Sequence, residues 1–199
     1  PIEQKSDQLK RAKNHAKWLM SKYKNVEFIE KDLTKTYLDF KSLFEPRYQI
    51  PLALANSKSR LRMVVLYQIA GSSSGLVVGT GNKVEDFGVG FFTKYGDGGV
   101  DISPIADLTK SEVRELAKKL GIAPEIISAR PTDGLWTDDR SDEDQIGASY
   151  GELEWAMDFL LGSRSAANIT DRQKKVIEIY NKFNSSNKHK MVPIPVFRK

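Results

Sequence analysis

Charged side chains that could bind a nucleotide lie among glycines in residues 79–101. Glu85, Lys94, Asp97 and Asp101 belong to this segment. Glycines let the backbone approach a phosphate group, or adopt positive φ where a side chain would clash. Glycine content alone is equally consistent with ordinary turns between strands. These four charged side chains, beside a flexible backbone, suit a metal-bound phosphate better than a hairpin, so the segment predicts a nucleotide site.

The elements that must position this segment alternate between helix and strand. Apolar residues recur at three- and four-residue steps over residues 6–23, and the stretch Val26-Glu27-Phe28-Ile29 predicts a strand after that helix. A second helix is predicted for residues 52–70, followed by a strand at 76–79. A small-residue turn after such a strand is typical of ligand sites in open sheets. The alternation predicts an α/β fold.

The C-terminal half carries signals for further helices. Thr109 with Glu112, and Ser149 with Glu152, have the spacing of a capping box, in which each side chain binds the backbone N–H of the other residue. Apolar periodicity predicts another helix for residues 171–183.

Residues 130–150 are the least helix-like and most charged part of the chain. Their acidic side chains include Asp133, Asp138, Asp142 and Asp144. Long irregular segments in compact domains are usually functional loops or lack a fixed structure. A lid over a ligand and a solvated acidic loop are equally consistent with this composition.

The composition is that of one globular domain. The 199 residues include 40% apolar and 29% charged residues, which is typical of soluble proteins. The chain has no cysteine, which excludes disulfides, zinc–thiolate sites and cysteine nucleophiles. It contains neither a signal peptide nor an apolar stretch of about eighteen residues, so a cytoplasmic location and no membrane partner are expected.

The net charge of +5 favours an anionic partner. Lysine and arginine are spread along the chain, and no nucleic-acid-binding motif accompanies them. A dinucleotide or a triphosphate therefore fits better than a duplex. We expect small-molecule substrates and no nucleic acid.

Three long motifs resemble those of the ammonia-dependent NAD synthetases, which belong to the ATP-pyrophosphatase group with adenine-nucleotide α-hydrolase-like folds. The motifs read GTGNKVEDFGVGFFTKYGDGGVD, SPIADLTKSEVRELAKKLGI and RPTDGLWTDDRSDEDQIGASY, and they begin at residues 79, 103 and 130. The resemblance extends from about residue 1 to the His189–Lys190 pair. It implies a doubly wound, Rossmann-like, mostly parallel sheet with helices on both faces.

The resemblance also implies a reaction. NAD synthetases use ATP and Mg²⁺ to adenylate the nicotinate carboxylate of deamido-NAD, with release of pyrophosphate, and ammonia then displaces AMP to give NAD. The family forms homodimers in which both subunits shape the dinucleotide site. A cysteine-free chain has no glutaminase nucleophile, which agrees with the use of free ammonia, although a separate glutaminase partner stays open.

The resemblance also implies binding and catalytic roles for individual residues at the positions where this sequence matches the family motifs. The implied contacts are Thr80, Lys110 and Thr132 for ATP, Glu85 for magnesium, and Arg60, Lys94, Asp101, His189 and Lys190 for deamido-NAD. Asp97 would bind ammonium and help to remove its proton, so Asp97 and Lys110 are the catalytic candidates. Without the resemblance, Arg60 is more typical of a helix surface, and Glu85 is equally typical of the first turn of a helix. The residues expected to converge at one rim of the sheet are Thr80, Glu85, Lys94, Asp101 and Lys110.

One family motif is absent from this sequence. The Ser-Gly-Gly-x-Asp-Ser phosphate loop follows the first strand of the family and supplies backbone amides for the ATP phosphates and an aspartate for the magnesium. We therefore expect residues 1–199 to form a single NAD synthetase domain without its first strand, phosphate loop and first helix. Such a chain is expected to be inactive alone.

Two other functions stay open. Another ATP-pyrophosphatase-type amide or thiolation ligase would share the activation chemistry, but it would not be expected to carry the motifs of residues 95–101 and 131–150 together. A non-catalytic basic module that binds nucleotides or nucleic acid would explain the charge without any reaction.

Overall fold

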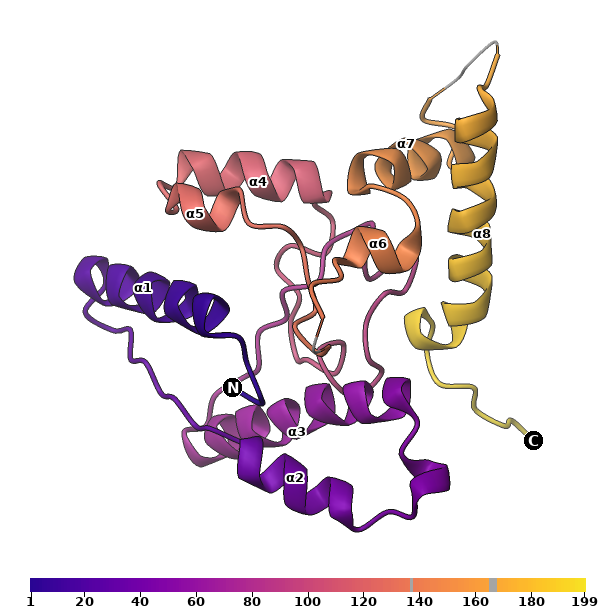
Figure 1. Cartoon of the computed structure of the whole chain (residues 1–199). Coiled ribbons are helices and arrows are strands. Elements are labelled where there is room, and N and C mark those ends of the chain that lie inside the picture. Colours follow the sequence, from indigo (N-terminus) through magenta and orange to yellow (C-terminus); the bar gives the residue numbers. More distant parts are fainter. Residues whose placement is uncertain (137, 165–167) are drawn as a thin grey trace.

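Helices make up most of the regular structure. The computed structural model describes residues 1–136, 138–164 and 168–199. In chain order its elements are α1 (Ser6–Lys22), α2 (Thr34–Ser42), the 3-10 helix η1 (Pro46–Tyr48), α3 (Pro51–Ser72), α4 (Lys110–Lys119), α5 (Pro124–Ile127), α6 (Asp142–Ile146), α7 (Tyr150–Leu160) and α8 (Asp171–Met191). The irregular chain between α3 and α4 runs through the middle of the molecule, with α3 on one side and α4, α6 and α7 on the other (Figure 1).

The helices predicted from local sequence signals are confirmed. At the start of α4, the Thr109 side chain accepts a hydrogen bond from the backbone N–H of Glu112, whose carboxylate accepts one from the backbone N–H of Thr109. Ser149 and Glu152 make the same reciprocal bonds at the start of α7. Both partners of a capping box lie within one helical turn, so the sequence alone specifies these helix starts.

Two helices differ from the prediction. α6 lies inside residues 130–150, which were expected to be irregular, and a capping box of Ser141 and Asp144 begins it. α8 runs on to Met191, so the His189–Lys190 pair is helical. Within the described residues, none of the helices could span a lipid bilayer, α8 included.

The predicted doubly wound sheet is not formed by the described residues. They contain a single parallel bridge, between Val78 and Ile102, in place of a set of strands. Residues 26–29, predicted as a strand, are irregular chain, and Ile29 is 46% exposed. A strand needs a second backbone segment alongside it to pair its N–H and C=O groups, and periodicity within one segment cannot supply that partner.

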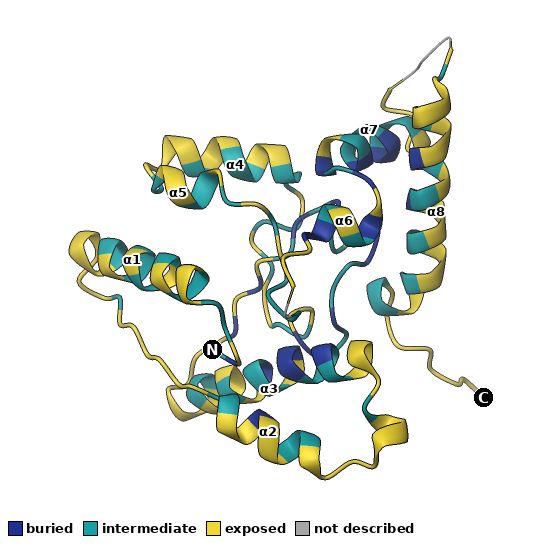
Figure 2. Ribbon diagram, in the orientation of Figure 1, coloured by how far each residue is buried: buried dark blue, intermediate teal, exposed yellow. Residues whose placement is uncertain are grey.

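The main hydrophobic core lies between residues 84–89 and helices α6, α7 and α8 (Figure 2). Its buried members are Val84, Val89, Ile146, Ala148, Leu153, Ala156, Met157, Val176 and Tyr180. Val84 and Val89 are fully buried, so both ends of the segment that contains Glu85 are fixed by packing.

An ion pair between the buried Lys58 and the exposed Glu3 holds the N-terminal segment against α3. Lys58 of α3 is 6% exposed, and its Nζ lies 2.8 Å from the Glu3 carboxylate and 5.0 Å from the centre of the Tyr37 ring in α2. A buried ammonium group needs such partners because an uncompensated charge is costly to desolvate. The contacts hold the N-terminal segment against α3.

Candidate active site

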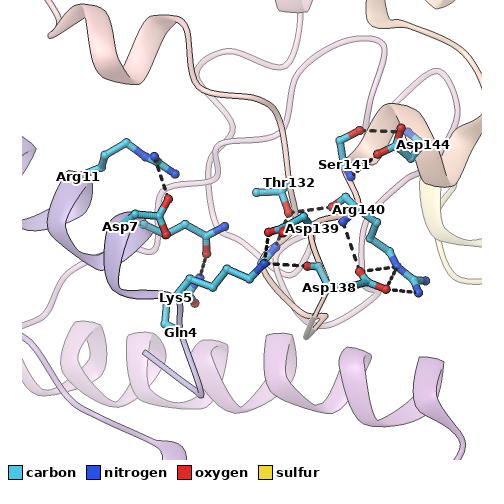
Figure 3. Close-up of polar contacts among 12 residues, drawn as sticks. Gln4, Lys5, Asp7, Arg11, Thr132, Asp138, Asp139, Arg140, Ser141 and Asp144 are labelled. Carbon is cyan, nitrogen blue, oxygen red and sulfur yellow. Dashed lines mark hydrogen bonds and ion pairs between the residues drawn. The ribbon is translucent and has the colours of Figure 1, made fainter.

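A cavity of about 1000 Å³ lies where α1, α3 and α4 meet the irregular segments of the chain. Residues 90–93 and 129–136 form part of its wall, and its volume is in the range of ligand pockets. Figure 3 shows Lys5 reaching from the start of α1 to Asp138 and Asp139, within residues 130–150. Lys5 Nζ donates to the carbonyl oxygen of Asp138 over 3.0 Å and to the carboxylate of Asp139. Residue 137, in the segment interpreted as a lid or an acidic loop, lies outside the described residues.

The cavity brings together part of the predicted site. The predicted residues that line it are Thr80, Glu85, Asp97, Lys110, Thr132 and Lys190. Within the described structure, the lining does not include Arg60, Lys94, Asp101 or His189. Lys94 and Asp101 therefore do not share the cavity with Glu85 and Lys110, and the expected convergence at one sheet rim is found only in part.

Glu85 and Lys110 form an ion pair in the cavity wall. Lys110 Nζ lies 3.1 Å from Glu85 Oε2. The Lys110 side chain is 23% exposed and the Glu85 side chain is 19% exposed. The ammonium group also lies 4.7 Å from the centre of the Tyr150 ring, within the range of cation–π attraction. The buried Asn82 side chain donates to Glu85 Oε2 and orients the carboxylate. The pair offers an oxygen ligand to a cation and a donor to a phosphate.

Asp142, at the start of α6, lines the same cavity. Its Oδ2 accepts a hydrogen bond from the Tyr150 hydroxyl over 3.2 Å. Burial, together with the negative charges of Glu85 and Asp133, raises the pKa of Asp142 to about 6. Burial and the charges of Glu85 and Asp142 also raise the pKa of Tyr150, so its hydroxyl remains a hydrogen-bond donor at neutral pH.

Asp97 is held against α3 by reciprocal hydrogen bonds. Ser59 Oγ donates to Asp97 Oδ1 over 2.7 Å and accepts from the backbone N–H of Asp97 over 3.0 Å. The backbone N–H of Thr93 also donates to Oδ1, over 3.1 Å. Only glycine fits at Gly96, since a Cβ there would lie 2.3 Å from Ser59 Oγ. The Asp97 carboxylate is therefore placed on the cavity before any ligand binds.

The remaining predicted residues lie on a surface that links α3 to α8. Arg60 Nε donates to the carbonyl oxygen of Lys94 over 3.1 Å, and Lys94 Nζ donates to the carbonyl oxygen of His189 over 2.7 Å. Asp101 accepts from the Val77 backbone N–H over 2.7 Å and from the Tyr67 hydroxyl over 3.0 Å. Both Asp101 oxygens thus hold the chain itself together in this structure.

Lys190 lines the large cavity and also a second cavity of about 90 Å³. Its Nζ donates to the carbonyl oxygens of Gly90 and Phe92, each over 2.8 Å. Burial lowers the pKa of Lys190. In the smaller cavity, burial raises the pKa of Asp86 to about 7, with smaller contributions from nearby carboxylates.

Sequence reasoning missed a polar face of α3. Asn56, Ser59 and Arg62 line the cavity and follow one another at three-residue steps, which is the spacing of one helix face. Arg62 Nη2 donates to Gln4 Oε1 over 3.0 Å, and burial lowers the pKa of Arg62. The spacing was visible in the sequence, whereas the contact with Gln4 depends on the fold. Asp142 was one acidic residue among several, and no signal distinguished it.

The cavity residues fit a magnesium ion that takes further ligands from a substrate. Glu85 offers a carboxylate oxygen, and Asp142 Oδ1 is buried without a hydrogen-bond partner among the described residues. The described residues contain no group of three metal-binding side chains. Water and phosphate oxygens would complete the coordination, as is usual for Mg²⁺.

A comparison over nearly the whole chain decides the family. A family model described as NAD synthase matches residues 1–193. The chain belongs to the NAD synthase family. The resemblance inferred from the motifs is confirmed, and the Glu85–Lys110 pair and Asp97 are features of a NAD synthase chain.

NAD synthetases are also among the curated relatives. The NH₃-dependent NAD⁺ synthetase of Mesoplasma florum is 40% identical over 151 residues, which cover 74% of this chain and 59% of that protein. The NH₃-dependent NAD⁺ synthetase of Carboxydothermus hydrogenoformans is 38% identical over 161 residues, which cover 79% of this chain and 64% of that protein. The chain therefore spans less than two thirds of the length of these NAD synthetases.

A solved structure supports the fold of this NAD synthase chain. The NMN synthetase from Francisella tularensis matches with a TM-score of 0.83 and 30% identity, covering 100% of this chain and 76% of that chain. The NAD synthetase from Campylobacter jejuni matches with a TM-score of 0.67 at 23% identity, which concerns the fold alone. The chain shares its fold with these neighbours, which are of the Rossmann-like class, although its described residues form a single β-bridge in place of the sheet.

Proposed function

We propose that this chain is part of an enzyme that converts deamido-NAD to NAD with ATP and ammonia, through an adenylated carboxylate and with release of AMP and pyrophosphate. The main support is that one cavity is lined by the Glu85–Lys110 pair and by Asp97. These side chains offer a cation ligand, a phosphate donor and an acceptor for an ammonium proton, which the reaction needs. The names of the relatives agree with this activity.

In the first half-reaction, the substrate carboxylate attacks the α-phosphorus of ATP. The bond between that phosphorus and the bridging oxygen breaks, and pyrophosphate leaves. Lys110 would donate to the phosphates and offset the charge on the leaving group. Thr80 and Thr132, which line the same cavity, would bind ATP through their hydroxyl groups. Magnesium held at Glu85 would neutralise phosphate charge.

In the second half-reaction, ammonia attacks the adenylated carboxyl carbon and the bond to AMP breaks. Ammonium must first lose a proton, and the new amide releases another. Asp97 would accept the proton of ammonium. Because Oδ1 accepts hydrogen bonds from Ser59 and Thr93, Oδ2 would be the oxygen that accepts the proton.

The contacts to the dinucleotide stay predictions. Lys190 lines the cavity, and its neighbour His189 is bonded through its carbonyl oxygen to Lys94, which is bonded in turn to Arg60. A dinucleotide that extends out of the cavity past Lys190 would therefore reach this surface. For Asp101 to bind a ribose hydroxyl, it would have to share or release the Tyr67 hydroxyl.

We propose that catalysis also requires a phosphate-loop segment of the Ser-Gly-Gly-x-Asp-Ser type, and that residues 1–199 alone are inactive. Exposed apolar residues support this proposal: Leu76 is 65% and Val78 is 54% exposed, although both lie in a segment predicted to be a central strand. A further strand alongside them would bury these side chains.

We also propose a homodimer whose interface includes α3. Besides its polar face, this helix carries Val64 and Tyr67, which are three residues apart and therefore on one side, and which are 65% and 40% exposed. Neighbouring exposed apolar side chains often mark an interface with another protein. In light scattering, the full-length protein should have twice the monomer mass and the V64E variant should lose the dimer, whereas a monomeric wild type would contradict the proposal.

The activity is tested by incubating the full-length protein with ATP, magnesium, ammonium and deamido-NAD. Formation of NAD, AMP and pyrophosphate in equal amounts is expected. Turnover of another acid without NAD formation would favour a different ligase of the ATP-pyrophosphatase group. Salt-sensitive binding of nucleic acid without nucleotide binding would favour a binding module. A cytoplasmic location, and the lack of nucleic-acid and membrane partners, stay predictions.

A second candidate differs only in the substrate. The Francisella tularensis protein, which matches this chain over 100% of its length, is an NMN synthetase. The corresponding reaction is amidation of the mononucleotide acid to NMN, and it would use the same cavity residues. Comparison of kcat/KM for the dinucleotide and mononucleotide acids separates the two. A higher value for the mononucleotide would replace the first assignment.

A further inference from the structure

Among the described residues, Asp142 Oδ1 is the one buried side-chain oxygen or nitrogen without a hydrogen-bond partner. Asp142 is 4% exposed, and its other oxygen accepts a hydrogen bond from the Tyr150 hydroxyl over 3.2 Å. A buried carboxylate oxygen that lacks a donor or a cation is costly to desolvate. A cation or a hydrogen-bond donor at this oxygen would remove that cost.

The charges near Asp142 favour a cation. Glu85 and Asp133 both add negative charge at this carboxylate, and Lys110 contributes positive charge. Lys110 is already engaged, because its Nζ lies 3.1 Å from Glu85 Oε2. If ATP draws Lys110 to its phosphates, Glu85 and Asp142 lose that counterion.

The local structure fixes Asp142 at the cavity. Ser141, which is fully buried, accepts from the backbone N–H of Asp144, and the Asp144 carboxylate accepts from the backbone N–H of Ser141. The backbone N–H of Asp142 itself donates to the carbonyl oxygen of Pro131 over 3.1 Å. Thr132, the proposed ATP contact, directly follows Pro131. The Asp142 carboxylate and the proposed ATP contact are therefore tied to each other through the backbone.

We propose that Asp142 acts with Glu85 as a further protein ligand for the divalent cation that accompanies ATP, in addition to any aspartate that a phosphate loop supplies. This proposal rests on the proposed function in one respect, namely that ATP is the substrate that brings the cation. Tyr150 positions the carboxylate by its bond to Oδ2, so that Oδ1 faces the ion. Two carboxylates, phosphate oxygens and water form the oxygen-rich ligand set that Mg²⁺ prefers.

Manganese binding to the full-length protein without substrates tests this assignment without any turnover. Mn²⁺ takes the same oxygen ligands as Mg²⁺, and the EPR signal of free Mn²⁺ falls as the ion binds. A site with two protein carboxylates should have a dissociation constant on the order of 1 mM. The D142N variant, which keeps the side-chain size and the bond to Tyr150, should bind roughly tenfold more weakly or worse. E85Q should weaken binding by a similar factor.

Asp139 provides the matched control, because its side chain is 96% exposed and lies in the same segment. D139N makes the same charge change and should leave Mn²⁺ affinity unchanged. Equal affinity of D142N and wild type would overturn the assignment, and so would the absence of saturable binding to wild type. A full-length protein that forms no NAD but keeps this binding pattern would refute the proposed function and leave the ligand assignment standing.

NMR on the wild-type protein provides a test that does not depend on the correct folding of any variant. Bound Mn²⁺ should broaden the amide signals of Asp142 and Tyr150 first. The amide signal of Arg47, in the 3-10 helix η1 outside the cavity lining, should be unaffected at the same Mn²⁺ concentration. Equal broadening at Arg47 and Asp142 would contradict a site at Asp142.

Discussion

The most quantitative prediction concerns Asp86, which faces the smaller cavity beside Lys190. Burial, with the charges of Glu85 and Asp97 in addition, raises its pKa from 3.8 to about 7, while Lys110 and Lys190 oppose the shift. Because the pKa is raised in the folded state, the protonated carboxyl group favours the fold below pH 3.8, and this contribution is lost as the pH rises through about 7. We expect D86N, which cannot ionise, to escape that loss.

The size of the effect follows from the shift. A shift of about 3 units at about 1.36 kcal/mol per unit gives about 4 kcal/mol for a fully desolvated group. Asp86 is half-buried and its cavity admits water, so screening should reduce this to about 2 kcal/mol. D86N should therefore raise the free energy of unfolding by about 2 kcal/mol above pH 7, and by little near pH 4.

Urea unfolding of wild type and D86N at a series of pH values measures this difference. D139N, at a side chain that is 96% exposed, controls for the general loss of one negative charge. A gain in D86N that is equal at pH 4 and pH 8 would refute the electrostatic explanation. No gain at pH 8 would show that the Asp86 carboxylate is well solvated or paired.

Three further predictions concern the cap of α7, the support of Asp97 and the lid. Glu152 is 34% exposed, and its pKa is lowered to about 2, chiefly by hydrogen bonds from Arg172. E152Q should lower the free energy of unfolding by about 1 kcal/mol at pH 7. Denaturation curves should show this difference disappear as the pH falls from 4.5 towards about 2. S59A removes a hydrogen bond to Asp97 and should reduce kcat/KM for ammonium roughly tenfold in steady-state assays, with the KM for ATP unchanged. Hydrogen exchange in residues 130–150 should slow when ATP and deamido-NAD bind, and an unchanged rate would contradict a closing lid.

The sequence predicts those parts of the fold that depend on interactions between residues close together in the chain. The capping boxes at Thr109 and Ser149 are local, so they correctly located the starts of α4 and α7. Ser141 and Asp144 have the same three-residue spacing, with aspartate in place of glutamate. Because several other acidic residues surround them, the sequence did not indicate that α6 begins there. Residues 26–29 have the composition of a strand, but a strand depends on a partner that is distant in sequence.

The same distinction applies to the candidate site. Family motifs located Glu85, Asp97 and Lys110, which the fold brings to one cavity. They could not reveal that both Asp101 oxygens accept hydrogen bonds from within the chain. The significance of Asp142 depends on burial and on an unpartnered oxygen, and both arise only when α6 packs beside the cavity.

The central claim is that one cavity holds separate groups for activating the carboxylate and for forming the amide. Isotope exchange between pyrophosphate and ATP, dependent on deamido-NAD, isolates the first step in the full-length protein. We predict that K110M loses both this exchange and NAD formation, whereas D97N keeps the exchange and forms little NAD. Exchange that persists in K110M, or that disappears in D97N, would contradict the account.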